Sequence, residues 1–285
     1  MTVLLVLAKA PVPGRVKTRL CPPADPAGAA EVAAAALLDT LDAVRAVPDA
    51  VPVLAHAGRL AGAVRAPQIR AALAGWHLLP QRGVGLDERL AHAHADAGAA
   101  FPGRPVLQIG MDTPQLGPDL LAAAASRLVG ADAPDALLGP ATDGGWWALG
   151  LRDAEAAAAL RGVPMSTPDT GRLTRAALVG RGLRVALLPT RSDVDDWATA
   201  LAVAREAAES RFARAVRRIA AGLPRVAGLP PVADLSPVPG PSPALGGGDA
   251  RGVPDAAESG GVGSAGEPGP AAPSSRRRLR AGGAR

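Results

Sequence analysis

The residues best suited to chemistry lie in one basic segment near the start of the chain, at 8–20 (AKAPVPGRVKTRL). The chain has 31 lysines and arginines, but its only lysines are Lys9 and Lys17, and both fall in this segment. An ammonium is a compact charge whereas a guanidinium is a planar fork, so lysines retained in an arginine-rich chain indicate a site for phosphate oxygens. We predict a nucleotide-phosphate site with these members: Lys9, Gly14, Arg15, Lys17 and Arg19. The alternative is a solvated basic turn.

The basic segment matches neither of the common glycine-rich phosphate loops. Gly14 precedes Lys17 and Thr18 by three residues, which fits neither G-x-x-x-x-G-K-[ST] nor G-x-G-x-x-G. The segment does follow a strand predicted at 3–8, which is apolar on both faces as in a central parallel strand. Ligands of open α/β sheets bind at the carboxyl ends of such strands, so the phosphates are expected there.

A carboxylate is predicted at the same edge of the sheet. Residues 105–116 (PVLQIGMDTPQL) read as an apolar strand that ends in Asp112, where Pro114 stops it. Mg²⁺ prefers oxygen ligands and often uses only one or two carboxylates together with substrate phosphates, so Asp112 is a candidate ligand. The alternative is that Asp112 caps a helix at 118–128.

Two further acidic stretches follow predicted strands. Residues 136–151 read as a strand, a turn at Thr142-Asp143-Gly144-Gly145 and a returning strand with Trp146 and Trp147, one ring of which could line a pocket. An ordinary tight turn is the alternative. Later, Asp193, Asp195 and Asp196 crowd the start of a helix that begins near Trp197. They favour a bound cation, or else they cap the helix.

The remaining pattern predicts alternating strands and helices. A helix at 27–47 and a strand at 51–55 complete a βαβ unit with the first strand. A later helix should turn Leu86, Leu90, Ala93 and Ala97 inward, and its His92 and His94, which are two residues apart, are interpreted as surface histidines. Further elements are expected as helices at 153–160 and 169–181, a strand at 184–189, and an interrupted helix that ends near 221.

Composition predicts one domain and a tail. The 285 residues are 48% hydrophobic, enough for a sizeable core in residues 1–222, whereas 223–285 are rich in Pro, Gly, Ala and Arg and predict a disordered tail. The net charge is +5 and the single cysteine, Cys21, permits no internal disulfide. The apolar start is too short for a signal peptide or a membrane span, so we expect a cytoplasmic protein. The basic run at 274–280 is a solubilising tail or a contact for a partner; we expect no nucleic-acid partner.

Together these segments resemble the DUF2064 family of the GT-A, or nucleotide-diphospho-sugar transferase, superfamily. The resemblance is carried by AKAPVPGRVKTRL at 8–20, IGMDTPQL at 109–116, GPATDGGWWALGL at 139–151 and, more weakly, LLPTRSDVDDWATA at 187–200. It implies a Rossmann-like three-layer α/β/α sandwich with a mostly parallel sheet. It also implies a divalent metal, Mg²⁺ or Mn²⁺, a nucleotide or nucleotide-sugar ligand and a small-molecule acceptor.

The resemblance also implies roles for particular residues. The activity expected is that of a Mg²⁺-dependent glycosyltransferase-like enzyme, with a nucleotidylyltransferase that releases pyrophosphate and a non-catalytic nucleotide-binding protein as alternatives. Asp112 and Asp143 would be catalytic, Asp112, Asp193 and Asp195 would bind the metal, and the acceptor pocket would contain Gly144, Gly145, Trp146, Ser166 and Thr167. The chain departs from the family pattern at Met165 and at Asp196, Ala198, Thr199 and Ala200.

Overall fold

The computed structural model describes residues 1–223. They form an α/β fold around a seven-stranded sheet in the order β3-β2-β1-β4-β6-β5-β7, in which only β6 is antiparallel to its neighbours. The strands are β1 Thr2–Lys9, β2 Ala50–Ala57, β3 His77–Pro80, β4 Val106–Gly110, β5 Ala136–Pro140, β6 Trp146–Leu151 and β7 Val185–Leu187. The predicted tail lies outside the described residues from residue 224 onward.

The first strand is central because its side chains are apolar on both faces. Val3, Leu4, Leu5 and Val6 are fully buried, and β1 pairs in parallel with β2 on one side and β4 on the other. A strand covered on both faces has no polar alternation, as in other parallel sheets. This confirms the prediction for 3–8, with one extra residue at each end.

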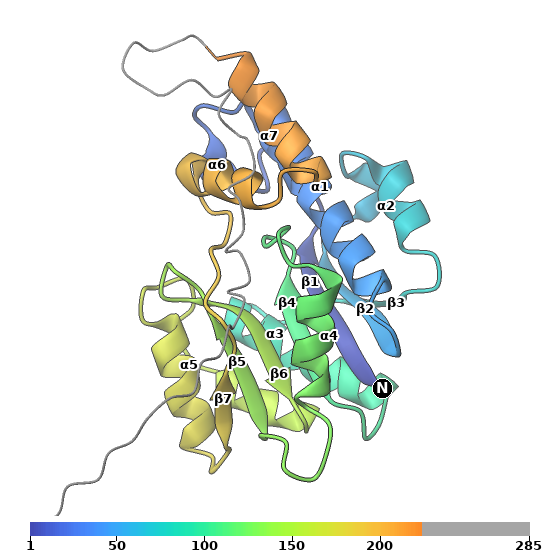
Figure 1. Cartoon of the computed structure of the whole chain (residues 1–285), viewed down its shortest axis with the longest axis vertical. Helices are drawn as coiled ribbons and strands as arrows, with labels where there is room; N and C mark the ends of the chain where they lie inside the picture. Colours follow the sequence, from blue (N-terminus) through green and yellow to red (C-terminus); the bar gives the residue numbers. More distant parts are fainter. Residues whose placement is uncertain (224–285) are drawn as a thin grey trace, which may run out of the picture. The chain divides into compact units, whose positions relative to one another are not determined.

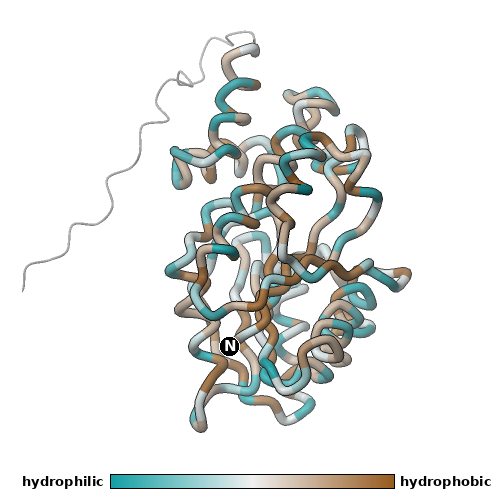
Figure 2. Tube along the Cα trace, turned by 90° about the vertical axis from the view of Figure 1, so that its right-hand side faces the viewer, coloured by the Kyte–Doolittle hydropathy of each residue, from teal (hydrophilic) through white to brown (hydrophobic). Residues whose placement is uncertain are grey.

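Helices cover both faces of the sheet (Figure 1). One face packs against α1 Pro26–Arg45, α2 Ala66–Ala72 and α4 Pro118–Ser126. The other packs against α3 Leu86–Ala100, the 3-10 helix η3 Ala154–Leu160 and α5 Thr170–Val179. Figure 2 shows hydrophobic stretches in the middle of the trace. The predicted three-layer α/β/α sandwich is therefore confirmed.

A second core lies beside the sheet, where α6 Trp197–Glu206 and α7 Arg211–Ala221 pack on α1. Phe212 is fully buried at its centre, and Leu20 from the short 3-10 helix η1 Thr18–Leu20 is buried in the same cluster. The last two helices consequently hold the end of the basic segment in place. Among the described residues, no helix is both long and apolar enough to cross a membrane.

The Asp39 side chain links α7 to α1 through hydrogen bonds. Its carboxylate accepts hydrogen bonds from the backbone N–H groups of Arg211 (3.2 Å) and Phe212 (2.8 Å), and from Nη1 of Arg211 (3.1 Å). Because α7 covers it, only 11% of the Asp39 side chain is exposed. The carboxylate thereby satisfies backbone donors at the helix start that have no partner within the helix.

We expect Asp39→Ala to lower the free energy of unfolding by about 2–3 kcal/mol, because it leaves buried donors unpaired. Asp42→Ala is the control, since Asp42 contacts only the Arg211 guanidinium (2.6 Å) and half of its side chain is exposed. The control should cost less than about 1 kcal/mol. Urea denaturation of both variants tests this, and equal losses would contradict the role of Asp39.

Two expectations for α3 are wrong. Leu86, predicted to face inward, is 42% exposed because it occupies the first helical position, at the rim of the sheet. His94, predicted at the surface, is fully buried, and neither ring nitrogen has a hydrogen-bond partner. Burial lowers the pKa of His94 to about 3, and the nearby Gln108 side chain opposes this shift. His94 is therefore neutral at physiological pH.

This burial predicts sensitivity to acid. The unfolded chain takes up a proton on His94 near its ordinary pKa of about 6.5, whereas the folded chain resists it until pH 3. Stability linked to His94 is thus present above pH 6.5 and falls by up to about 1.4 kcal/mol per pH unit below it. We expect the melting temperature of His94→Leu to fall less between pH 7 and pH 5 than that of the native chain. His92→Leu, from the same helix but partly exposed, should keep the native slope, and equal slopes in all three proteins would refute the assignment.

Candidate functional site

The polar segments singled out in the sequence meet at one edge of the sheet. The six strands other than β6 run in the same direction, so their carboxyl ends lie on the same side. The basic segment leaves the end of β1 there, Asp112 follows β4, Asp143 follows β5, and 190–196 follow β7. The topology therefore brings together groups that lie far apart in the sequence.

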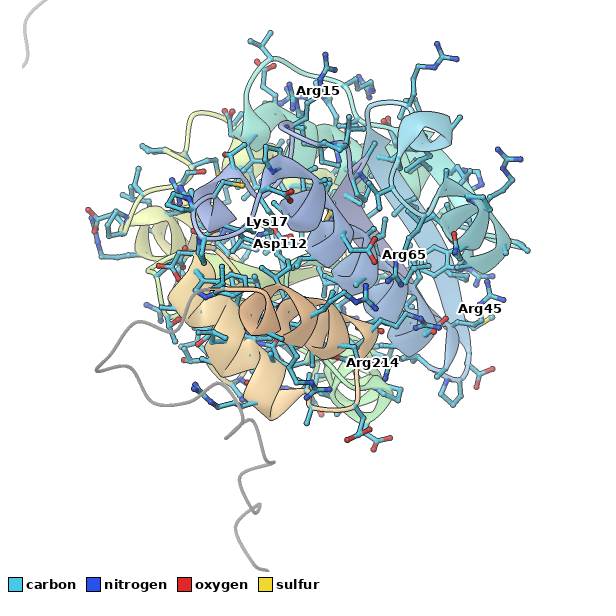
Figure 3. The ribbon with its side chains drawn as sticks, turned by 90° about the horizontal axis from the view of Figure 1, so that it is seen from above. Arg15, Lys17, Arg45, Arg65, Asp112 and Arg214 are labelled. Atoms are coloured by element: carbon cyan, nitrogen blue, oxygen red, sulfur yellow. The ribbon has the colours of Figure 1, made fainter. Side chains whose placement is uncertain are left out.

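Lys17 joins the basic segment to the acidic groups (Figure 3). Its Nζ lies 2.9 Å from Oδ2 of Asp112 and also donates to the carbonyl oxygen of Val194. Only 9% of the Lys17 side chain is exposed, against 41% for Asp112. The pair is thus partly shielded from solvent, where an ion pair is screened less than at the surface.

Residues 191–195 form a strap across the ends of β4 and β5. Arg191 donates its N–H to the Pro140 carbonyl (3.1 Å), and Val194 donates its own to the carbonyl of Asp112 (3.0 Å). The Val194 side chain is buried in the core formed by α1, α6 and α7. Since Asp193 and Asp195 flank this anchored valine, their backbone positions are fixed at the site.

Asp193 is the most strongly perturbed carboxyl group of the site. Its Oδ1 is buried and has no hydrogen-bond partner. Burial, then the negative charges of Asp112 and Asp143, raise the pKa of Asp193 to about 7, while Lys17 opposes the shift. The site therefore carries more negative charge than its own lysine neutralises, which favours an added cation.

Asp195 and Asp196, the other acidic residues of this stretch, make different contacts. Asp195 Oδ2 pairs with Arg19 Nη1 at 2.9 Å, an exposed contact at the rim. Asp196 is the N-cap of α6, where its side chain and that of Thr199 form a capping box. The capping alternative for Asp112 is wrong, because Gly117 occupies the N-cap of α4.

The Asp-Gly-Gly turn packs against the segment that precedes α5. Asp143 is exposed and its Oδ1 accepts from the Gly145 N–H (2.8 Å), as in an ordinary turn. Gly144 has φ +87°, and its carbonyl accepts from the N–H of Gly171 (2.8 Å). This contact brings the turn to the segment with Ser166 and Thr167, so the predicted acceptor residues are neighbours.

The two tryptophans have different surroundings. Trp147 is buried in the core, and its Nε1 donates to the Pro189 carbonyl (2.9 Å). Trp146 is half-buried and, like Met165, packs against the core cluster under α3, η3 and α5; its Nε1 donates to Thr174 Oγ1 (3.2 Å). One ring is thus in the core and the other is partly accessible, and the pocket expected at the second ring stays a prediction.

Lys9, Gly14 and Arg15 remain at the surface of the basic segment. Lys9 ends β1, Gly14 has φ +72°, and no carboxylate of the described residues forms an ion pair with Lys9 or Arg15. In Figure 3, Arg15 lies apart from the Lys17 and Asp112 pair. Lys9 and Arg15 are therefore the cations of the segment that a bound anion would meet first.

Two glutamines contribute to the site in ways that the sequence analysis missed. Gln81 Nε2 donates to the carbonyls of Ala8 and Ala55 (2.9 Å each), which ties the ends of β1 and β2 together. Gln115 Nε2 donates to the carbonyl of Ser192 (2.7 Å), while its Oε1 is buried without a partner. Gln115 could have been included in the predicted site because it lies three residues after Asp112 in the same segment.

The donor set is compatible with a hard divalent cation. It consists of carboxylate oxygens, including the buried and unpartnered Oδ1 of Asp193. Within residues 1–223, no three His, Cys, Asp or Glu side chains converge tightly enough to hold a metal by themselves. A Mg²⁺ ion here would depend on Asp112, Asp193 and oxygens of its ligand, which is a common arrangement for this ion.

The chain is an α/β protein with a cluster of charged side chains at the carboxyl edge of a mostly parallel sheet. Residues 40–167 match the family described as "Uncharacterized protein conserved in bacteria (DUF2064)". The predicted resemblance to DUF2064 is thereby confirmed, and the matched range contains the Asp112 and Asp143 segments but not the basic one. The search of curated proteins found no match.

Among solved structures, a proposed nucleotide-diphospho-sugar transferase from Desulfovibrio desulfuricans G20 is similar, with 25% identity over 78% of this chain and 96% of that chain and a TM-score of 0.66. CMP:2-keto-3-deoxy-manno-octonic acid synthetase in complex with CTP has 11% identity over 73% and 99% of the chains and a TM-score of 0.47. A cytidylyltransferase from Leptospira borgpetersenii serovar Hardjo-bovis (strain JB197) has 12% identity over 77% and 94% and a TM-score of 0.47. The first of these supports assignment to the nucleotide-diphospho-sugar transferase fold.

Proposed function

We propose that the protein is a Mg²⁺-dependent glycosyltransferase-like enzyme that uses a nucleotide-sugar donor. The observation that carries the proposal is the convergence of the basic segment with Asp112, where Lys17 Nζ lies 2.9 Å from the carboxylate. Cations beside carboxylates at this edge suit a diphosphate held together with a divalent metal. The likeness to a proposed nucleotide-diphospho-sugar transferase supports the same ligand class.

In the proposed reaction, an acceptor oxygen attacks the anomeric carbon of the sugar, and the bond from that carbon to the diphosphate oxygen breaks. Lys9 and Arg15 bind the departing nucleoside diphosphate, because the described residues include no carboxylate paired with them. Asp143, exposed on its turn, accepts the proton of the acceptor hydroxyl. Asp112 and Asp193 would hold Mg²⁺, which when bound supplies a positive charge that stabilises the leaving diphosphate.

Nucleotidylyl transfer, with release of pyrophosphate, is the second candidate. Four cations in one segment, Lys9, Arg15, Lys17 and Arg19, would suit the higher charge of pyrophosphate. The structure pairs Lys17 with Asp112 and Arg19 with Asp195, so half of these cations are already partly neutralised. The remaining charge fits a nucleoside diphosphate at least as well, which leaves glycosyl transfer as the first choice.

A thermal-shift panel of nucleoside triphosphates and nucleotide sugars, each with and without Mg²⁺, tests the proposal. A ligand that binds only the folded state raises its melting temperature, by an amount that grows with concentration above Kd. We expect Mg²⁺-dependent stabilisation by at least one nucleotide sugar, and then release of a nucleoside diphosphate when acceptors are added. Stabilisation by triphosphates alone, with pyrophosphate as product, would favour the second candidate instead.

A further inference from the structure

The Lys17 ammonium lies beside Asp112, where a divalent cation bound to that carboxylate would also lie. Its ammonium has three N–H donors. One is directed at Asp112 Oδ2, 2.9 Å away, and another at the carbonyl of Val194, between Asp193 and Asp195. The side chain is only 9% exposed, so these partners replace most of its water.

The fold holds this ammonium in position. Lys17 has a left-handed backbone with φ 49°, which is uncommon for a residue with a side chain and persists only where the surroundings impose it. Its carbonyl accepts from the N–H of Leu20 (3.0 Å), and Leu20 is buried in the core shared with α6 and α7. The lysine stem is therefore tethered at its base, although the ammonium itself can rotate.

We propose that Lys17 is a tethered counter-ion that competes with a divalent cation for Asp112. Without a metal, its ammonium neutralises Asp112 and holds the strap at Val194. When a metal binds Asp112, the ammonium must leave that oxygen, which frees it to contact the ligand. The inference rests on the proposed function, because it concerns the cation that this function uses, but its tests require no substrate and no turnover.

The two lysines of the chain permit a direct test on the native protein. Acetylation with a limiting amount of acetic anhydride, followed by peptide mass spectrometry, compares Lys17 with Lys9, the only other lysine. Lys9 is exposed and lies in the same segment. Its acetylation therefore serves as an internal reference for differences in reagent concentration and for the screening of charges by salt. We expect Mg²⁺ alone to raise the Lys17 to Lys9 ratio several-fold, compared with KCl at equal ionic strength. An unchanged or lower ratio would overturn the proposal.

Direct measurement of Mn²⁺ binding provides an independent test. Free Mn²⁺ is counted by electron paramagnetic resonance during titration of the native chain, Lys17→Gln and Lys9→Gln. Glutamine keeps a donor for the Val194 carbonyl but removes the charge. We expect Lys17→Gln to bind Mn²⁺ about tenfold more tightly than the native chain, and Lys9→Gln to gain less than about threefold.

Each outcome of this titration bears on the proposal. Equal gains in both variants would indicate only a general change of net charge and would overturn it, as would weaker binding by Lys17→Gln or the absence of any Mn²⁺ binding. Should Lys17→Gln fail to fold, the acetylation experiment on the native chain still decides the question. Failure of the proposed function would instead appear as no response to any nucleotide sugar, with the lysine reactivity and Mn²⁺ results unaffected.

Discussion

Replacing Asp112 with asparagine should reduce turnover by about 100-fold or more while the protein stays folded. Asparagine preserves size and an acceptor oxygen for Lys17, but it removes the charge that a divalent cation needs at the end of β4. Loss of one preorganised charge at a reacting centre costs about 10² to 10³ in kcat. Because the ion pair with the largely buried Lys17 is weakened, we also expect a stability loss of roughly 1–2 kcal/mol.

Asp119→Asn is the matched control for Asp112→Asn. Asp119 is an exposed aspartate in the first turn of α4, so the same chemical change is made outside the strap and the basic segment. Turnover with the nucleotide sugar from the thermal-shift panel and Mg²⁺-dependent affinity for that ligand should both be native in the control. Retained Mg²⁺ dependence in Asp112→Asn would exclude Asp112 as an essential ligand and leave Asp193 and Asp195 as the candidates.

Gly144→Ala should be the most destabilising substitution in the predicted acceptor pocket. A Cβ built on Gly144 lies 2.0 Å from the carbonyl oxygen of Pro168, and the backbone φ of +87° is unfavourable for alanine. The added Cβ would meet backbone atoms of Pro168. Backbone cannot move aside as a flexible side chain would. We expect a loss of roughly 3 kcal/mol or more, which corresponds to a melting temperature lower by about 6–12 °C.

Gly162→Ala separates the two causes of this loss. Gly162 has nearly the same φ, +80°, but its Cβ would meet no atom within 4 Å. Gly162→Ala should therefore lower the free energy of unfolding only by the cost of holding alanine in a left-handed backbone, roughly 1–2 kcal/mol. Differential scanning calorimetry of both variants checks the comparison. If the two lose equal stability, close packing between Gly144 and Pro168 is not what fixes the turn.

The sequence predicted the sheet well where strands are long and apolar. The strand at 3–8 and the pair that flanks the Asp143 turn could be identified because uninterrupted apolar runs and turn residues leave few alternatives. The predicted interruption of the last helix is confirmed as the break between α6 and α7. The 3-10 form of 154–160 was not predicted, since it depends on local hydrogen bonds.

Side-chain partnerships were harder to predict than elements. Helical spacing places His94 on the buried stripe, four residues after Leu90 and three before Ala97, but its polar ring led to its interpretation as a surface residue. Periodicity could not show that Lys17 pairs with Asp112, since that contact depends on two strand ends and on the strap from 191–195. The roles assigned to the site residues, and the metal itself, remain predictions for the experiments above.

The contact between Lys17 and the Val194 carbonyl joins residues 177 positions apart, which has a consequence for biosynthesis. A ribosome adds about 5–20 residues per second, so roughly 9–35 s separate the synthesis of the two partners. During this interval, the nascent chain displays its lysines without the acidic strap. Because Val194 is anchored by α6 and α7, the site can form only after those helices have left the exit tunnel. Polypeptides whose translation stops after Asp112 but before that point would contain the basic segment and Asp112 but no assembled site.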